Sequence, residues 1–265
     1  MKAFDDMGRG TSLVVMALWI MSVWLGAEAA GQASLAAALE GGSLEQRHKA
    51  LLEVLDTPPD QRDPRIWAAV IAEMKRALAV YHRLHDETLP EPAPSTTMSN
   101  AYYEDLQNAV AQSRDPAVIP LLVDLSGYGG PPSVTLVRFG DLAVPALLVA
   151  ARGTTNDLGQ QYGARFALAA MCRAPIPDAI APVSAASREQ IVRVAQELWN
   201  RRFNWDETIA LASFAIATGD PDLRRLLERL AVDPSEWKQY GIVDPEQIAQ
   251  VQRQVQVQLN KTPPQ

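Results

Sequence analysis

Two segments of the chain repeat one pattern, and this repeat constrains the fold more than any other feature. The sequence D-P-A-V-I-P-L-L begins at Asp115, and D-L-A-V-P-A-L-L begins 26 residues later at Asp141. In each segment an aspartate that can cap a helix is followed by a proline, Pro120 or Pro145, and then by two leucines. Proline is tolerated best in the opening turn of a helix. The pattern therefore predicts two successive helices that each begin with a proline in or just beyond the first turn.

Helical spacing of apolar residues continues through the rest of the chain, whereas β-branched runs of period two are nearly absent. Asp63, Asp220 and Asp244 are each followed directly by a proline, which predicts three more capped helix starts. Val255–Leu259 alternates as a strand would, but the cap and the helical spacing before it favour a helix. We therefore expect an all-α fold.

The breaks between these segments predict the domain organisation. A helix at residues 48–55 should bury His48, Leu51, Leu52 and Leu55, and should end at Thr57–Asp60. Residues 30–89 are predicted to form an N-terminal helical hairpin or cap, residues 90–99 a linker rich in Pro, Ser and Thr, residues 100–260 the repeat domain, and residues 261–265 a disordered tail.

Within the repeat domain, the glycine-rich and proline-rich segment Gly127–Ser133 is expected to break the chain. A very short helix at Val134–Phe139 is expected to follow it.

The first 29 residues have the layout of a secretory signal peptide. Lys2 and Arg9 precede the uncharged, apolar segment Leu13–Gly26, and Ala27–Ala29 offers an A-x-A cleavage site. We expect cleavage after Ala29 or Ala30 and a periplasmic or secreted protein. The alternative is an uncleaved membrane anchor, although the apolar run is shorter than the roughly 20 residues that span a bilayer comfortably.

The charge balance and the cysteine content restrict the class of protein further. The chain has 24 basic and 31 acidic residues, and cleavage would leave 22 and 28. A nucleic-acid-binding protein needs a clustered positive field, so we expect no nucleic-acid partner. Cys172 is the only cysteine, so no intramolecular disulfide can form. Its apolar surroundings in the sequence predict a buried, unreactive thiol.

The repeat and its neighbouring segments resemble the HEAT-like α-helical repeat family. The resemblance rests on RDPAVIPLL (114–122), LVRFGDLAVPALL (136–148) and GARFALAAM (163–171), and it covers roughly residues 101–202. It implies helical hairpins that stack on one another, because a single hairpin cannot bury its apolar face alone.

The same resemblance gives structural roles to individual residues. It implies that Asp115 and Asp141 occupy the acidic position of the repeat, Pro120 and Pro145 its proline position, and Arg165 its arginine position. The offset of 26 residues is shorter than the roughly 40 residues of a typical unit, so we expect an irregular α-solenoid. Tetratricopeptide-like pairing is the alternative, but no W-x-x-L-G-x-x-Y signature supports it.

Few residues suggest chemistry. His82 and His85 lie three positions apart beside carboxylates and could form part of a metal site, but the sequence identifies no further ligand and a solvated helix C-terminus that favours imidazoles explains them more simply. The chain has no G-x-S-x-G, H-E-x-x-H, Walker A or dinucleotide-binding pattern. We therefore expect no catalytic residues, no cofactor and no metal.

Aromatic side chains are the remaining candidates for a binding groove. Core packing accounts more simply for Tyr102 and Trp199, whereas Tyr128 lies in a glycine-rich loop and is the least easily buried. The aromatic candidates are Tyr102, Tyr103, Tyr128, Trp199, Trp205 and Trp237.

The leading functional expectation is an exported, non-enzymatic scaffold whose surface binds a protein or peptide partner. One alternative is a small exported metal-binding protein or hydrolase that uses His82 and His85. Another is a periplasmic adaptor tethered to the membrane by an uncleaved N-terminal helix.

Overall fold

The chain is all-helical wherever its structure is described. A computed structural model describes residues 30–84, 100–128, 130–153, 158–173, 175–201 and 207–261. Every regular element in these ranges is a helix, which confirms the predicted all-α class. No helix among them is both long and apolar enough to cross a membrane. The predicted signal peptide (1–29) and linker (90–99) lie outside the described residues.

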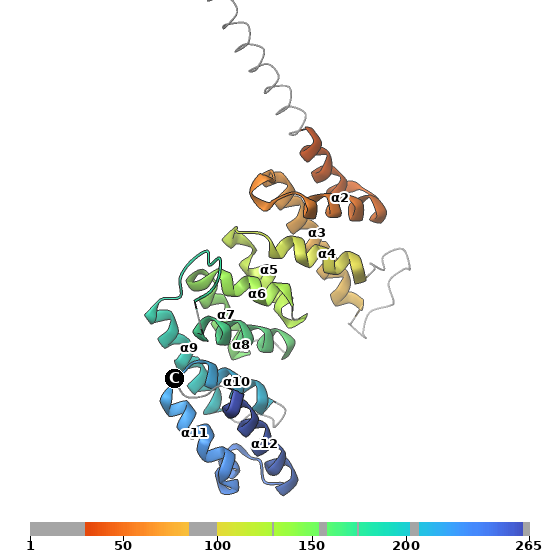
Figure 1. Ribbon diagram of the computed structural model, residues 1–265. Coiled ribbons are helices and arrows are strands. Elements are labelled where there is room, and N and C mark those ends of the chain that lie inside the picture. Colours follow the sequence, from red (N-terminus) through yellow and green to blue (C-terminus); the bar gives the residue numbers. More distant parts are fainter. Residues whose placement is uncertain are drawn as a thin grey trace, which may run out of the picture. The chain divides into compact units, whose positions relative to one another are not determined.

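The chain divides into two compact units, Met1–Ser113 and Arg114–Gln265. In the N-terminal unit, α2 and α3 both pack against α4 (Figure 1). Its helices are residues 30–41, α2 (Leu44–Asp56), the 3-10 turn η1 (Pro59–Gln61), α3 (Pro64–Leu84) and α4 (Asn100–Ala111). Helix α4, which the sequence assigns to the repeat domain, thus groups with the helices that precede it.

Local side chains set the helix boundaries in this unit. Ser43 begins α2 with a capping box: its hydroxyl accepts from the Gln46 N–H at 3.3 Å, and its own N–H donates to the Gln46 carboxamide at 2.8 Å. Asp63 accepts from the Arg65 N–H at 2.7 Å at the start of α3, as predicted. Helix α2 ends at Asp56, immediately before the predicted stop.

The predicted buried face of α2 is partly wrong. Leu51 is fully buried, but Leu52 is 46% exposed. The buried face instead contains Ala50, Leu51 and Val54. Leu52 is the next residue after Leu51 and therefore points about 100° away from it around the helix.

The C-terminal unit is a succession of packed helices (Figure 1). Helix α5 packs against α6 and α7, α6 against α8, α7 against α8 and α9, and α8 and α9 against α10, which in turn contacts α11 and α12. Most of these contacts join a helix to the next or the next but one, and α5 also contacts α8. These α-helices are α5 (Ile119–Leu125), α6 (Pro131–Arg138), α7 (Val144–Arg152), α8 (Leu158–Arg173), α9 (Ala185–Trp199), α10 (Thr208–Ala217), α11 (Pro221–Val232) and α12 (Pro245–Lys261).

The two repeat prolines occupy matching places in their helices. Pro120 is the second residue of α5, and Pro145 is the second residue of α7. Both therefore lie in the opening turn, where the backbone N–H has no partner within the helix, and this prediction is confirmed. Asp115 also caps as predicted: its carboxylate accepts from the Ala117 N–H at 2.9 Å and begins a 3-10 turn that leads into α5.

Asp141 does not cap its own helix, and this prediction is wrong. The α7 N-terminus has no side-chain cap. The Asp141 carboxylate instead accepts from the Ser184 N–H at 2.9 Å, at the start of α9. This bond and those from the Ser187 and Ser184 hydroxyls lower the pKa of Asp141. Asp141 thus fixes the end of the loop that precedes α9.

The backbone of that proline-rich loop lies directly on the corner between α6 and α7. The Asp141 N–H donates to the Pro182 carbonyl at 3.2 Å, and the Ile180 N–H donates to the Arg138 carbonyl at 2.6 Å. Gly140 has φ of +53°, and a Cβ there would lie 2.0 Å from the Ala181 carbonyl oxygen. Only glycine permits both this backbone conformation and this close approach.

The structure also defines the start of α6 and the end of α12. Helix α6 begins at Pro131, so the predicted break at Gly127–Ser133 extends too far and its last three residues are helical. Proline at the first helical position accounts for this early start. Helix α12 runs unbroken through Lys261, which confirms helix at Val255–Leu259 and leaves residues 262–265 outside the described ranges.

Helix α8 makes another close backbone approach in this unit. A Cβ on Gly163 would lie 2.2 Å from the Ser126 carbonyl oxygen, and a Cβ on Gly127 would lie 2.8 Å from the Gln160 backbone nitrogen. Both contacts lie between α8 and the 3-10 turn Ser126–Tyr128, called η4. The two glycines therefore allow α8 to pack backbone to backbone.

We predict that Gly163→Ala destabilises the protein by about 1–3 kcal/mol, because the new methyl group must displace backbone from α8. Urea unfolding followed by circular dichroism at 222 nm measures the change. Gly41→Ala is the control, since a Cβ there meets nothing within 4 Å. An unchanged midpoint for Gly163→Ala would contradict the close packing.

Candidate functional site

Arg165, the predicted repeat arginine, lies at the centre of a buried polar cluster in the C-terminal unit. Its Nε donates to the Ala151 carbonyl at 3.1 Å, and a terminal nitrogen donates to the Gln161 carboxamide at 3.1 Å. The other terminal nitrogen lies 3.4 Å from a Glu207 carboxylate oxygen. Its guanidinium also lies over the Tyr162 ring, 5.8 Å from the centroid.

This cluster joins three segments of the unit. Ala151 lies in the last turn of α7, so Arg165 neutralises carbonyls at the negative end of that helix. Burial lowers the pKa of Arg165, and Glu207, just before α10, opposes that effect. Within the described residues, the Arg165 guanidinium thus contacts acceptors on α7, on its own helix α8 and just before α10. This arrangement positions helices and leaves the cation little access to solvent.

A second buried charge lies in the N-terminal unit. The Glu73 side chain is only 2% exposed, and Arg47 and Arg76 approach its two carboxylate oxygens to 2.9 and 2.5 Å. The Tyr102 hydroxyl donates to the same carboxylate at 2.7 Å. Burial, followed by the charge of Glu73, raises the pKa of Tyr102 well above its usual range, so the phenol remains a donor. The cluster ties α2, α3 and α4 together.

A histidine and a carboxylate lie beside this cluster. The His48 Nε2 is 2.9 Å from an Asp105 carboxylate oxygen, and its ring packs edge-on against Tyr102 with centroids 5.3 Å apart. Such a pair can orient a general base, but a nucleophile is also needed. No hydroxyl or thiol side chain hydrogen-bonds to His48 within the described ranges. The geometry is that of a hydrogen bond between α2 and α4.

The structure describes neither of the histidine side chains considered for a metal site. His82 lies in the last turn of α3, but its side-chain placement and all of His85 lie outside what the structure describes. In the described part of the chain, no group of three or more His, Cys, Asp or Glu residues is arranged to hold a metal ion. The alternative of a metal site at His82 and His85 therefore remains untested by the described residues.

The predicted aromatic candidates mostly belong to the core. Tyr102, Trp199 and Trp237 are buried, and the Trp237 indole donates to the Leu230 carbonyl at 2.8 Å. Tyr103 is half-buried. Trp205 and the side chain of Tyr128 lie outside the described residues. The expected aromatic groove does not form from the three buried rings.

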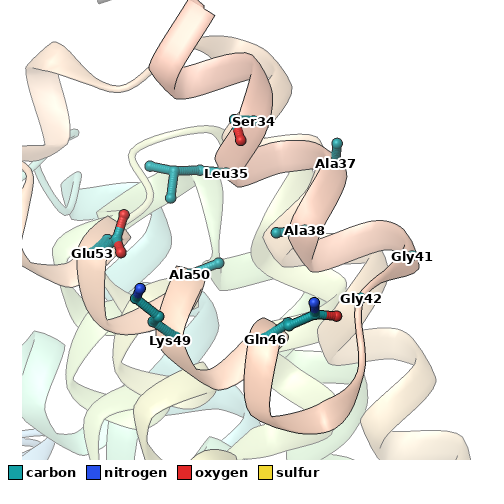
Figure 2. Close-up of a pocket in the computed structure, with 10 residues that line it drawn as sticks. All are labelled: Ser34, Leu35, Ala37, Ala38, Gly41, Gly42, Gln46, Lys49, Ala50 and Glu53. Carbon is teal, nitrogen blue, oxygen red and sulfur yellow. The ribbon is translucent and has the colours of Figure 1, made fainter.

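A shallow depression of about 520 Å³ lies between the helix of residues 30–41 and α2. Figure 2 shows Ser34 and Leu35 on the first helix, and Lys49 and Glu53 on the second. The remaining lining residues are small except Gln46: Ala37, Ala38, Gly41, Gly42 and Ala50. The depression has few convergent polar groups, which a small-molecule site needs to orient its ligand.

The exposed faces of α6 and α8 carry apolar side chains. Val134 on α6 is 57% exposed, and Leu158 and Phe166 on α8 are 53% and 60% exposed. Val137 on α6 is half-exposed. These two helices pack against each other, and α5 packs against both, so their exposed faces point away from α5. We call these four residues the α6–α8 surface.

Helices α9 and α11 of the same unit expose mainly polar side chains, although Val149 on α7 and Val232 on α11 are also exposed. Helix α9 exposes Glu189 and Arg193, and α11 exposes Asp222, Arg225 and Glu228. An exposed apolar side chain needs no explanation by itself, but several on packed helices mark an interaction surface. The sequence held part of the signal: exposed positions of α6 and α8 carry Val134, Leu158 and Phe166, whereas those of α11 are mostly charged. Arg138, Gln160 and Arg173 also lie outside the buried faces of α6 and α8.

Comparison with known proteins gives no match to a protein-family profile, to a curated protein or to a solved structure. No relative therefore assigns a role to any of these side chains. Their roles follow from burial, hydrogen bonding and exposure within the described residues.

Cys172, near the end of α8, has the environment expected of an unreactive thiol. Burial raises its pKa from about 9 to about 11, against the opposing charges of Arg188 and Arg173. The thiol is half-buried rather than fully buried as the sequence predicted. Because the thiolate is the nucleophile, the folded thiol is almost entirely unreactive near neutral pH.

We predict that Cys172 reacts with a disulfide reagent at pH 8 at least tenfold more slowly in the native protein than in urea, and that the native rate rises toward pH 11. The raised pKa also means that its contribution to stability is complete below about pH 9 and is lost as the pH rises through about 11. Stopped-flow absorbance measures the rate, with Cys172→Ser as the blank. Equal rates in the folded and unfolded chain would contradict this.

Proposed function

We propose that this chain is an exported, non-enzymatic helical-repeat scaffold that binds a protein or peptide partner. The α6–α8 surface carries the proposal. Large apolar side chains that remain more than half exposed on two packed helices lose favourable burial unless another molecule covers them. An aromatic residue such as Phe166 is a typical centre for such a contact.

The succession of helices supports an irregular, HEAT-like solenoid as the architecture. In the C-terminal unit each helix packs against the next or the next but one, as stacked hairpins require. Pro120 and Pro145 both lie at the second position of α5 and α7. Arg165 links α7 and α8 through the Ala151 carbonyl. A stack of this kind suits binding, since it exposes the faces of successive helices side by side.

Export is the second part of the proposal and rests on the sequence. The apolar segment Leu13–Gly26 between basic residues and an A-x-A site supports a cleaved signal peptide. A chain with the single cysteine Cys172 relies on packing alone, so it tolerates an oxidising compartment without forming an intramolecular disulfide.

We predict that the exported protein begins near Ala30. Intact mass and N-terminal sequencing of the protein from the exported fraction measure the start. Ala27→Leu together with Ala29→Leu should block cleavage, because the cleavage site needs small residues. A mature protein that begins at Met1 would instead support the membrane-tethered adaptor.

We predict that Phe166→Gln and Val134→Gln remove the partner while leaving the fold intact, because both side chains are mostly exposed. Val232→Gln on α11 is the matched control, since Val232 is 74% exposed and lies outside the α6–α8 surface. Each variant serves as bait in the exported fraction, and the affinity for the partner identified is then measured by calorimetry. We expect at least a tenfold loss for the first two variants and none for the control.

Equal retention of the partner by all three variants would contradict the assignment of the α6–α8 surface. Circular dichroism of each variant checks that the helix content is unchanged. A loss that accompanied unfolding would identify a folding defect rather than a lost contact.

A further inference from the structure

A concave feature of the C-terminal unit lies between α10 and α12. It is a groove of about 310 Å³ whose wall on α12 carries three glutamines and one arginine. Ile209 on α10 and Val257 on α12 provide apolar surface. The α12 lining residues are Gln250, Arg253, Gln254, Val257 and Gln258.

The three glutamines form a row along one face of the helix. Gln250, Gln254 and Gln258 are spaced by four residues, which corresponds to about 6 Å per step along an α-helix. An extended peptide presents the N–H and C=O of every second residue to the same side, about 6.4–6.8 Å apart. The two repeats differ by less than about 1 Å per step. The rotatable glutamine side chains can absorb that difference.

Each carboxamide also has the right groups for a peptide backbone. It offers two N–H donors and one carbonyl acceptor, so one side chain can bond to both the N–H and the C=O of a single residue. Three such side chains would engage alternate residues of a five-residue extended segment. An α-helical ligand would satisfy its own backbone and leave these carboxamides unused.

The hydrogen bonds of α12 distinguish this row from the other glutamines. Gln252 donates to the Leu230 carbonyl at 3.3 Å, and Gln256 donates to Asn260 at 3.0 Å. Within the described residues, the carboxamide oxygen of Gln254 is buried and has no hydrogen-bond partner. A buried acceptor without a donor is unfavourable, and rotation of the Gln254 side chain that brings this oxygen to a ligand N–H would remove that penalty.

The groove also has a charge that an acidic ligand would complement. Arg253 is exposed, and no ion pair involves it in the described part of the chain. It lies within one helical turn of both Gln250 and Gln254. The mildly acidic chain therefore offers a free cation beside its backbone-binding row.

We propose that the α10–α12 groove binds an extended peptide segment through Gln250, Gln254 and Gln258, with an acidic side chain of the peptide paired to Arg253. Ile209 and Val257 contact an apolar side chain of the same segment. This site goes beyond the proposed function, because it lies on other helices than the α6–α8 surface and recognises backbone rather than an apolar face.

The test uses the exported protein and three fluorescein-labelled heptapeptides, followed by fluorescence anisotropy. The first alternates valine and threonine around a central aspartate, and the second replaces that aspartate with asparagine. The third keeps the aspartate but carries N-methyl groups on the backbone nitrogens of the aspartate and of every second residue to either side of it. We expect a dissociation constant below about 1 mM for the first peptide, and at least tenfold weaker binding of the third.

Substitutions on one helix separate the roles. Gln254→Leu removes the unpartnered buried oxygen, so it should keep or raise the melting temperature and still weaken peptide binding at least tenfold. Gln256→Leu is the matched control: the same change on the same helix, outside the groove, should leave affinity unchanged. Arg253→Gln should abolish the preference for the aspartate peptide over the asparagine peptide.

Several outcomes would overturn the proposal. These are no binding of the first peptide at about 1 mM, equal binding of the N-methylated peptide, or equal losses for Gln254→Leu and Gln256→Leu. Preferential binding of a helical peptide of the same charge would assign the groove to another occupant. Phe166→Gln should not change peptide affinity, so failure at this groove and failure of the α6–α8 surface are distinguishable.

Discussion

The contact between α8 and the turn at Ser126–Tyr128 is the constraint on which the C-terminal unit depends. Gly163 and Gly127 bring two stretches of backbone closer than any side chain would allow. Helix α8 then contacts α5, α6, α7 and α10, so its position determines theirs. With Cys172 as its only cysteine, the chain has no intramolecular disulfide to hold this arrangement, and close packing has to supply the stability.

Buried charged side chains make the packing of the helices more specific. Apolar contacts are non-directional, whereas Glu73 in the N-terminal unit and Arg165 in the C-terminal unit require partners at defined positions. Glu73 selects an arrangement in which Arg47, Arg76 and Tyr102 converge from three helices. Arg165 requires the end of α7 to lie against α8. Both groups lie in the interior, where their contacts join neighbouring helices.

Two surfaces remain for function, and they differ in chemistry. The α6–α8 surface offers apolar area, which gains free energy by burial and accepts many partner shapes. The α10–α12 groove offers carboxamides and a cation, which discriminate by hydrogen-bond geometry and charge. A scaffold with both could hold a folded partner on one set of helices and an extended segment on another. The stacking of successive helices makes such separate sites compatible with one chain.

The sequence by itself determined which segments form helices and where most of these helices begin. Periodicity and the Asp-Pro pairs predict α3, α11 and α12 because capping and proline placement depend on neighbours within one turn. The same local logic places Pro120 and Pro145 in opening turns. The resemblance to HEAT-like repeats predicts Arg165 as a repeat position. The residues that Arg165 contacts on other helices, however, are distant in sequence.

Tertiary structure decided the features that depend on contacts between distant segments. Asp141 has a local sequence similar to that of Asp115, yet the proline-rich loop before α9 lies against it and its carboxylate accepts from the Ser184 N–H instead. Leu52 is exposed although it fits an apolar run, because only one face of α2 meets other helices. The exposure of Phe166 and the buried, unpartnered carboxamide oxygen of Gln254 likewise depend on which helices pack nearby. Local pattern fixes where a helix begins, but only packing decides which of its faces stays available to a partner.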